Sequence, residues 1–170
     1  MTMTDQNSFA PMFGMGNPND AYAQYFIGNS YLNPLTNPAE AGVGLANVTF
    51  EPGCRNNWHI HHADKGGGQI LICTDGRGWY QEWGKDPQEL TPGTVVVIPA
   101  GVKHWHGAAA DSWFSHIAFE APGEGCSSRW MTISILKPSS QRLLRVCFSG
   151  HPQGARFFKF RPFIGENRRP

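Results

Sequence analysis

In the stretch Gly53-Cys-Arg-Asn-Asn-Trp-His-Ile-His-His-Ala-Asp-Lys-Gly-Gly-Gly-Gln69, one residue separates His59 from His61, and His62 follows directly. In an extended strand, residues two apart project from the same face, so both imidazoles leave this segment on one side. Two imidazoles on one face form a chelating pair for a transition-metal ion. The stretch therefore predicts one half of a metal site.

A second His-x-His pair occurs later in the chain, in Pro99-Ala-Gly-Val-Lys-His104-Trp-His106. A fold that joins the two pairs places several imidazoles inside a barrel, where they have no water to bind. A metal ion makes such a cluster favourable. We predict that the ion is bound by His59, His61, Gln69 and His104. The alternative is a hydrogen-bonded polar cluster in an empty barrel.

The composition indicates one small β-rich domain. The 170 residues suffice for a single hydrophobic core but not for two independent ones. The chain has 20 glycines, 13 prolines and 12% aromatic residues, which favours short strands joined by many turns. Short strands at regular spacing, with almost no helix, indicate a double-sheet jelly roll or a barrel.

The sequence also favours a cytoplasmic protein without a membrane partner. No apolar run approaches the length that spans a bilayer, and no secretory signal opens the chain. The cysteines are Cys54, Cys73, Cys126 and Cys147, and they show neither close pairing nor metal-type spacing. We therefore expect no disulfide framework.

The charges divide along the chain. Residues 1–125 carry five Lys or Arg and twelve Asp or Glu, whereas residues 126–170 carry nine and one. We expect a flexible arm at 1–19, whose apolar side chains could pack on a partner subunit, a main domain at 20–125, and a basic extension at 126–170. An altered reading frame or a vector-derived extension would also give the composition of residues 126–170. The basic residues form no recognisable motif, so nucleic-acid binding is not favoured.

Turn residues separate a series of short predicted strands. These are expected at residues 25–35, 43–51, 59–61, 69–73, 79–83, 94–99 and 112–120. Residues 62–68, with three consecutive glycines, are expected to loop out of the barrel. The turn at 74–78 predicts that 69–73 and 79–83 pair as a hairpin. The continuous apolar run at 94–99 predicts a strand buried on both faces.

Two patterns resemble the signature motifs of the cupin family. They are Gly53-x5-His59-x-His61 and Gly93-x5-Pro99-x-Gly101-x2-His104. The resemblance extends over about 25–120. It implies an all-β, RmlC-like double-stranded β-helix, which is the jelly-roll barrel that the composition also favours.

A closer resemblance is to small bacterial cupins related to manganese-dependent hydroxynitrile (mandelonitrile) lyases, and to cupins associated with carboxymuconolactone decarboxylases. It rests on Trp58-His-x-His, Gly-Gln69-x-Leu-Ile, Lys-His104-Trp-His106-Gly-Ala and Ser115-His116-Ile-Ala. The resemblance implies that the metal ligands are His59, His61, Gln69 and His104. The ion is then manganese, with iron, nickel, zinc or cobalt as alternatives. His62 or Asp64 would replace Gln69 if the glycine-rich loop supplied the fourth ligand.

The same resemblance implies that His116 faces the metal and acts as acid or base. If His116 points inward, Phe114 and Ala118 do so too, and Ser115 and Ile117 point outward.

Three neutral imidazoles and a neutral amide leave the charge of a divalent ion uncompensated, so the site would be a Lewis acid. His106 or His116, with an ordinary pKa near 6.5, could then take the proton of a substrate hydroxyl. We therefore predict a lyase of the hydroxynitrile lyase type that acts on a small hydroxy or oxo compound, in a homodimer or higher homo-oligomer. The alternatives are a sugar or keto-acid isomerase, a cupin dioxygenase and a non-catalytic metal-binding sensor. For His106, a hydrogen-bonding role beside the site is the alternative to catalysis.

Overall fold

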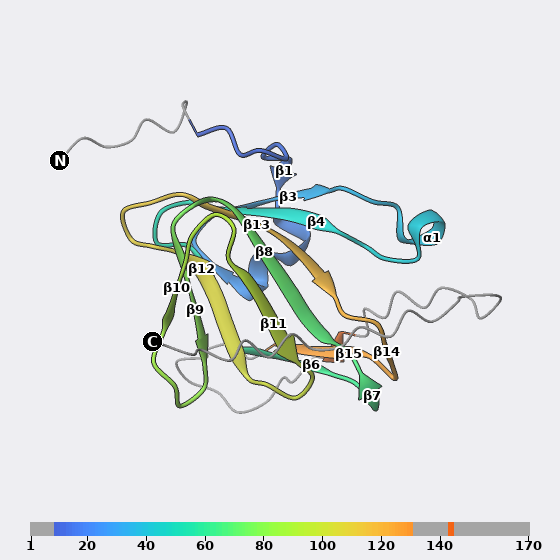
Figure 1. The fold of residues 1–170 in the computed structure, drawn as a ribbon. Helices are drawn as coiled ribbons and strands as arrows, with labels where there is room; N and C mark the ends of the chain where they lie inside the picture. Colours follow the sequence, from blue (N-terminus) through green and yellow to red (C-terminus); the bar gives the residue numbers. More distant parts are fainter. Residues whose placement is uncertain (1–8, 131–142, 145–170) are drawn as a thin grey trace, which may run out of the picture.

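The computed structural model describes residues 9–130 and the strand Leu143–Leu144 (Figure 1). Within these residues, helical structure is limited to a 3-10 helix, η1 (Asp20–Tyr25), and one short α-helix, α1 (Pro38–Ala41). The strands are β1 (Asn17–Pro18), β2 (Phe26–Ile27), β3 (Ser30–Pro34), β4 (Ala46–Phe50), β5 (Arg55–Asn56), β6 (His59–His62), β7 (Lys65–Gly66), β8 (Gly68–Gly76), β9 (Gly78–Glu82), β10 (Gln88–Leu90), β11 (Val95–Pro99), β12 (His104–Ala108), β13 (Phe114–Glu120), β14 (Gly123–Glu124), β15 (Ser127–Trp130) and β16 (Leu143–Leu144).

Two antiparallel sheets form the barrel. The first has the strand order β1-β3-β4-β13-β8-β11, and the second has the order β10-β9-β12-β6-β15-β16. The short strand β5 joins the second sheet by pairing with β12 and β2, and β7 pairs with β14 as a separate ribbon. The predicted all-β jelly roll is therefore confirmed. In the part of the chain described here, no helix is long and apolar enough to cross a membrane.

Alternate residues of the strands form one apolar core. Phe50, Leu71, Ile98 and Phe114 are almost completely buried in it. Burying such a side chain stabilises the fold by roughly 1.5–3 kcal/mol. The ring of Phe50 lies 5.3 Å from the ring of His116, so this core also supports the polar site.

The chain changes sheet at glycine turns where we predicted continuous pairing. Within the expected strand at 25–35, Gly28 has φ 90 and separates β2 of the second sheet from β3 of the first. The predicted hairpin of 69–73 with 79–83 is wrong, because β8 lies in the first sheet while β9 pairs with β10 and β12 in the second. At the end of β8, Gly76 has φ 69, and a Cβ there would collide with the carbonyl of Trp113. At this closely packed glycine the chain leaves β8 and crosses to β9 in the second sheet.

The apolar run at 94–99 is an edge strand. Val96 and Ile98 are buried, but Val95 and Val97 are 56% and 65% exposed. The prediction of burial on both faces is therefore wrong. The alternation shows that one face of β11 packs on the core and the other faces outward, and among the described strands β11 pairs with β8 alone. By contrast, the chain does loop out between β6 and β8 as expected, with β7 inside the loop.

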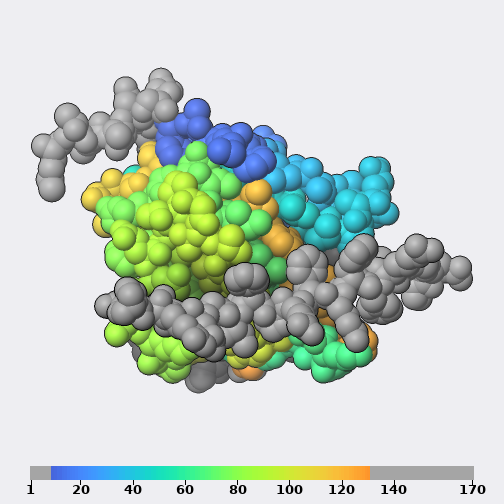
Figure 2. All heavy atoms as spheres, viewed as in Figure 1, coloured from blue at the N-terminus to red at the C-terminus, as the bar shows by residue number. Residues whose placement is uncertain are grey.

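Residues 9–18 lie against the barrel, which differs from the loose arm expected at 1–19. Phe9 stacks on Trp113 with ring centroids 5.2 Å apart, and the side-chain amide of Asn47 donates to the carbonyl of Gly14 over 2.8 Å. Figure 2 shows the N-terminal residues, in blue, lying along the body of the molecule. These contacts explain why Ser115, on the outer face of β13, is fully buried.

The barrel also continues beyond the expected boundary at residue 125. Strand β15 pairs with β6, with Ser128 opposite His61 and Trp130 opposite His59. Its last residue stacks on His59 and on Tyr25, with ring centroids 4.2 Å and 4.8 Å apart. The expected separation of 126–170 from the main domain therefore does not hold for residues 126–130; the rest of that segment, apart from the backbone of β16, lies outside the described residues.

Candidate metal centre

The two predicted histidine pairs meet inside the barrel. His59 and His61 project from one face of β6 and are 0% and 5% exposed. His104 of β12 lies opposite His59 in the strand register, and the two rings are 4.1 Å apart. Because β6 and β12 are antiparallel neighbours, the period of two in each strand brings these side chains to one place.

Backbone carbonyls fix the tautomers of two of these imidazoles. The Nδ1 of His59 donates to the carbonyl of Asn57 over 2.9 Å, and the Nδ1 of His104 donates to the carbonyl of Val102 over 3.0 Å. A carbonyl only accepts hydrogen bonds, so each ring carries its proton on Nδ1 and has a lone pair on Nε2. The Nε2 atoms are thus the available ligands.

The Nε2 atoms of His59 and His61 are buried and have no hydrogen-bond partner among the described residues. Leaving a polar atom unsatisfied inside a protein costs about 1–3 kcal/mol. The side-chain oxygen of Gln69 lies 3.3 Å from Nε2 of His104, where two lone pairs face each other as the groups are oriented here. A cation bound near Nε2 of His59, Nε2 of His104 and the side-chain oxygen of Gln69 would satisfy these three atoms, so these residues fit a metal ion.

A second candidate group overlaps this one. The ligand nitrogens of His59, His104 and His106 all lie within 4.8 Å of one another, whereas His61 lies outside this closely spaced group. Unlike His61, however, His106 has polar neighbours at both ring nitrogens: Nδ1 is 3.0 Å from Nε2 of His116, and Nε2 is 2.9 Å from the side-chain nitrogen of Asn56. The closer spacing thus favours His106 as the third ligand, whereas the unsatisfied Nε2 favours His61.

Burial keeps the imidazoles of His59, His104, His106 and His116 neutral. It lowers the pKa of His59 and of His106 well below the ordinary value, and neighbouring imidazoles act in the same direction. Burial is also the main cause that lowers the pKa of His104 to about 4 and that of His116 to about 3. Neutral rings at neutral pH retain the lone pairs that a metal ion or a substrate proton requires.

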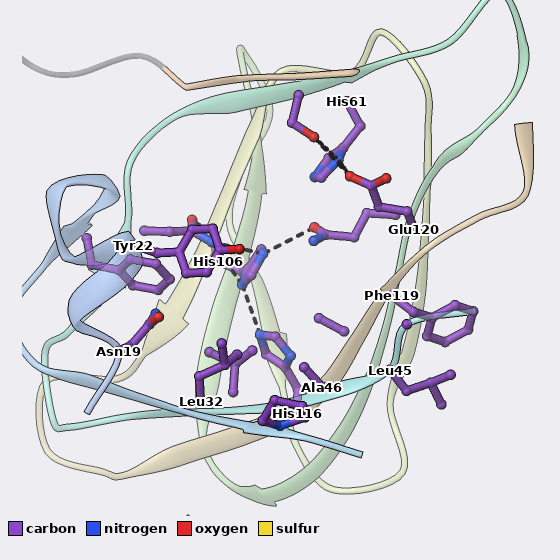
Figure 3. A pocket seen from close by; sticks show the side chains of 18 of the residues that line it. Asn19, Tyr22, Leu32, Leu45, Ala46, His61, His106, His116, Phe119 and Glu120 are labelled. Atoms are coloured by element: carbon purple, nitrogen blue, oxygen red, sulfur yellow. Dashed lines mark hydrogen bonds and ion pairs between the residues drawn. The ribbon is translucent and has the colours of Figure 1, made fainter. Parts of the chain in front are cut away.

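The predicted catalytic residues lie together beside the candidate ligands. His116 is 0% exposed, its Nδ1 has no partner in the described chain, and its Nε2 contacts His106. Figure 3 shows the rings of His106 and His116 directed toward one another. His116 thus contacts His106, and both rings line the cavity described next.

A cavity of about 440 Å³ opens beside these residues. Its polar end is lined by Asn56, His61, Gln69, His106, His116, Glu120 and Ser128. Its apolar wall is formed by Phe26, Leu32, Leu45, Ala46, Val48, Ala118, Phe119 and Trp130, with Tyr22 nearby. Among the described lining residues, Glu120 is the only one that is charged at neutral pH when the imidazoles are neutral.

Sequence reasoning missed four residues of this site. Asn56 contacts His106, Glu120 and Ser128 contact His61, and Trp130 stacks on His59. The strand at 112–120 was expected, so its last residue, Glu120, could have been considered as a cavity residue. No pattern in the sequence marked Ser128 or Trp130, because their strand was not predicted.

The double-sheet barrel and its histidine cluster define a cupin. A model of the family described as "Cupin domain" matches residues 46–114. The chain is 43% identical over 110 residues to a protein named (R)-mandelonitrile lyase from Granulicella tundricola, an alignment that covers 64% of this chain and 81% of that protein. The chain belongs to the cupin family, and the cupin resemblance and the likeness to mandelonitrile lyase are both confirmed.

Solved structures agree with this assignment. A cupin-like protein from Thermotoga maritima is 37% identical, with a TM-score of 0.60, and the match covers 71% of this chain and 88% of that one. A cupin-2 domain protein from Rhodospirillum rubrum, 17% identical with a TM-score of 0.50 over 60% of this chain and 66% of that one, shares the fold.

Proposed function

We propose that this cupin is a metal-dependent lyase of the hydroxynitrile lyase type, which cleaves a cyanohydrin into a carbonyl compound and hydrogen cyanide. The observation that carries the proposal is the pair of buried Nε2 atoms, on His59 and His61, that lack a partner in the described structure. Its similarity to a mandelonitrile lyase supports the reaction class.

The ion would be held by Nε2 of His59, His61 and His104 and by the side-chain oxygen of Gln69. This donor set is neutral and contains imidazoles, which suits a divalent transition ion. We propose manganese, as in the lyases that the sequence resembles. When bound, such an ion supplies Lewis acidity toward the oxygen of a substrate hydroxyl.

The paired imidazoles of His106 and His116 would handle the proton. One of them accepts the proton of the cyanohydrin hydroxyl, and the 3.0 Å contact between the rings lets the pair share it. As the C=O bond forms, the bond between the carbinol carbon and the nitrile carbon breaks, and its electron pair leaves with cyanide. The imidazolium then returns the proton to cyanide, so that hydrogen cyanide leaves and the histidines are neutral again.

The cavity favours an uncharged substrate with an apolar group. Its described lining contains no Lys or Arg to pair with a phosphate or carboxylate, and Glu120 would repel either. The apolar wall suits the ring or alkyl group of a small cyanohydrin. These features argue against the keto-acid isomerase that the sequence left open, because its substrate carries a carboxylate.

Metal content and mandelonitrile cleavage test the proposal. Purified protein should contain about one divalent ion per chain, and the double variant His59→Ala/His104→Ala should lose both the ion and the activity. His116→Ala should retain the ion but cleave mandelonitrile about 10²- to 10⁴-fold more slowly, since that is the typical contribution of a positioned base.

The matched control is His62→Ala, because His62 lies on the same strand with an exposed side chain. This variant should retain the parent protein's metal and rate of benzaldehyde release. The proposal is wrong if the parent protein, loaded with manganese, iron, nickel or zinc, cleaves mandelonitrile no faster than buffer.

A further inference from the structure

His61 is oriented by side chains, whereas His59 and His104 are oriented by backbone carbonyls. The Nδ1 of His61 lies 3.0 Å from the hydroxyl of Ser128 and 3.4 Å from the carboxylate of Glu120. The hydroxyl of Ser128 in turn donates to the same carboxylate oxygen over 3.0 Å. Figure 3 shows the carboxylate of Glu120 beside the ring of His61 at the polar end of the cavity.

The direction of these hydrogen bonds follows from the chemistry of Glu120. An ionised carboxylate only accepts hydrogen bonds, so the single proton of the Ser128 hydroxyl points toward it. The hydroxyl oxygen then offers a lone pair to His61, whose Nδ1 must carry the proton. The Nε2 of His61 is left with a lone pair, in agreement with its lack of a partner among the described residues.

Without Glu120 the hydroxyl of Ser128 has no such constraint. It can turn and donate its proton to Nδ1 of His61, and the neutral ring must then carry its own proton on Nε2. A protonated Nε2 cannot bind a metal ion, so the state of His61 as a ligand depends on this carboxylate.

We propose that Glu120 and Ser128 are positioning residues that fix the tautomer of His61 and thereby prepare its Nε2 to bind the ion. This inference rests on the proposed function for its metal site. The two side chains come from different strands: Glu120 ends β13, and Ser128 lies opposite His61 in the pairing of β15 with β6. Both lie outside residues 46–114, which the cupin domain model matches.

The tautomers can be measured in the metal-free, full-length protein. In ¹⁵N-labelled protein at pH 7.5, long-range nitrogen–proton correlations distinguish a ring protonated on Nδ1 from one protonated on Nε2. The parent protein should show His59, His61 and His104 all protonated on Nδ1. Glu120→Ala, and the double variant Glu120→Ala/Ser128→Ala in which Nδ1 of His61 has neither partner, should shift His61 toward the Nε2-protonated form.

His59 and His104 provide an internal control for folding. Their partners are the carbonyls of Asn57 and Val102, so both should remain protonated on Nδ1 in each variant. Ser127→Ala is the matched control, because Ser127 is the adjacent residue of β15 and its side chain points to the opposite face. It should leave His61 unchanged.

Metal affinity gives a second measurement. Calorimetric titration with Mn²⁺ should show binding to the double variant that is about 10–100-fold weaker than to the parent, as is typical when the partner of a metal-binding histidine is lost. The inference is overturned if His61 remains protonated on Nδ1 in the double variant, or if the affinity is unchanged. A parent protein that binds no divalent ion yet shows His61 protonated on Nδ1, with the shift in the variants, would refute the proposed metal site while supporting the role of Glu120 and Ser128 at His61.

Discussion

Acid should destabilise the metal-free protein well before its carboxylates are protonated. Burial lowers the pKa of His104 to about 4 and that of His116 to about 3, from an ordinary value of 6.5. Between these values the unfolded chain binds protons that the folded protein does not bind. The stability due to the neutral rings is therefore fully present above about pH 6.5 and falls as the pH decreases toward the lowered pKa values.

The size of the loss follows from the pKa values. Each pKa unit corresponds to 1.36 kcal/mol. At pH 5.0 each of the two histidines therefore lowers the free energy of unfolding by roughly 2 kcal/mol relative to pH 7.5. Together they reduce the free energy of unfolding by about 4 kcal/mol relative to pH 7.5. The pKa values of His59 and His106 are lowered by the same cause and add to the effect. A domain of ordinary stability, with about 5–15 kcal/mol, would lose a large fraction of it.

Urea unfolding of chelator-treated protein, followed by tryptophan fluorescence, measures this loss. Between pH 8.5 and pH 7.5 the free energy of unfolding should be nearly constant, which provides the control. His116→Phe removes one buried titrating group, so this variant should lose about 2 kcal/mol less than the parent between pH 7.5 and pH 5.0. A parent protein whose free energy of unfolding differs by less than about 1 kcal/mol between pH 7.5 and pH 5.0 would refute the reasoning.

Other predictions concern the packing of the barrel. A chain that ends at Gly125 lacks β15, so it should be insoluble or unable to bind metal; a soluble, metal-containing product would show that the strand is dispensable. Trp130→Ala removes the ring that stacks on His59 and should lower the free energy of unfolding by about 2–3 kcal/mol in urea titrations. The control is Trp83→Ala, at a side chain that is 62% exposed, which should lower it by less than about 1 kcal/mol. Gly68→Ala should destabilise by about 3 kcal/mol or more, because Gly68 has φ 101 and a Cβ there would collide with a carbonyl of β11; a melting temperature equal to that of the parent would contradict this.

Which histidines come together could largely be predicted, because the two members of each pair lie on one face of the same strand. His59 and His61 share a face in any extended segment, and so do His104 and His106. Joining the two pairs required only that their strands become neighbours, which the cupin-like glycine and proline spacing implied. The contact of His116 with His106 was not predictable in detail, because it depends on packing between two strands of different sheets.

The errors in the fold share a physical cause. The turn at 74–78 has the composition of a hairpin turn, but composition does not determine whether the next strand returns beside the last one or crosses to the other sheet. In the structure, the close approach of Gly76 to Trp113 accompanies the crossing. Likewise, the apolar run at 94–99 shows only that its residues are hydrophobic. Whether both faces are buried depends on what packs on each side of the sheet, and Val95 and Val97 lie on the exposed face.

The predicted boundary at residue 125 rests on the change in charge along the chain. Charged side chains lie at the surface of strands and extensions alike, so this change does not show where backbone pairing ends. The basic segment does begin near this point, with Arg129, but that residue lies within β15 and pairs with Ile60 of β6. The strand reads Ser-Ser-Arg-Trp, without the alternating apolar residues that mark a strand in sequence. Its place in the barrel depends on backbone pairing with a strand far away in the chain and on the stacking of Trp130 on His59. Because Ser128 contacts His61 and Trp130 stacks on His59, the end of the domain has to be defined by that pairing and not by the change in charge.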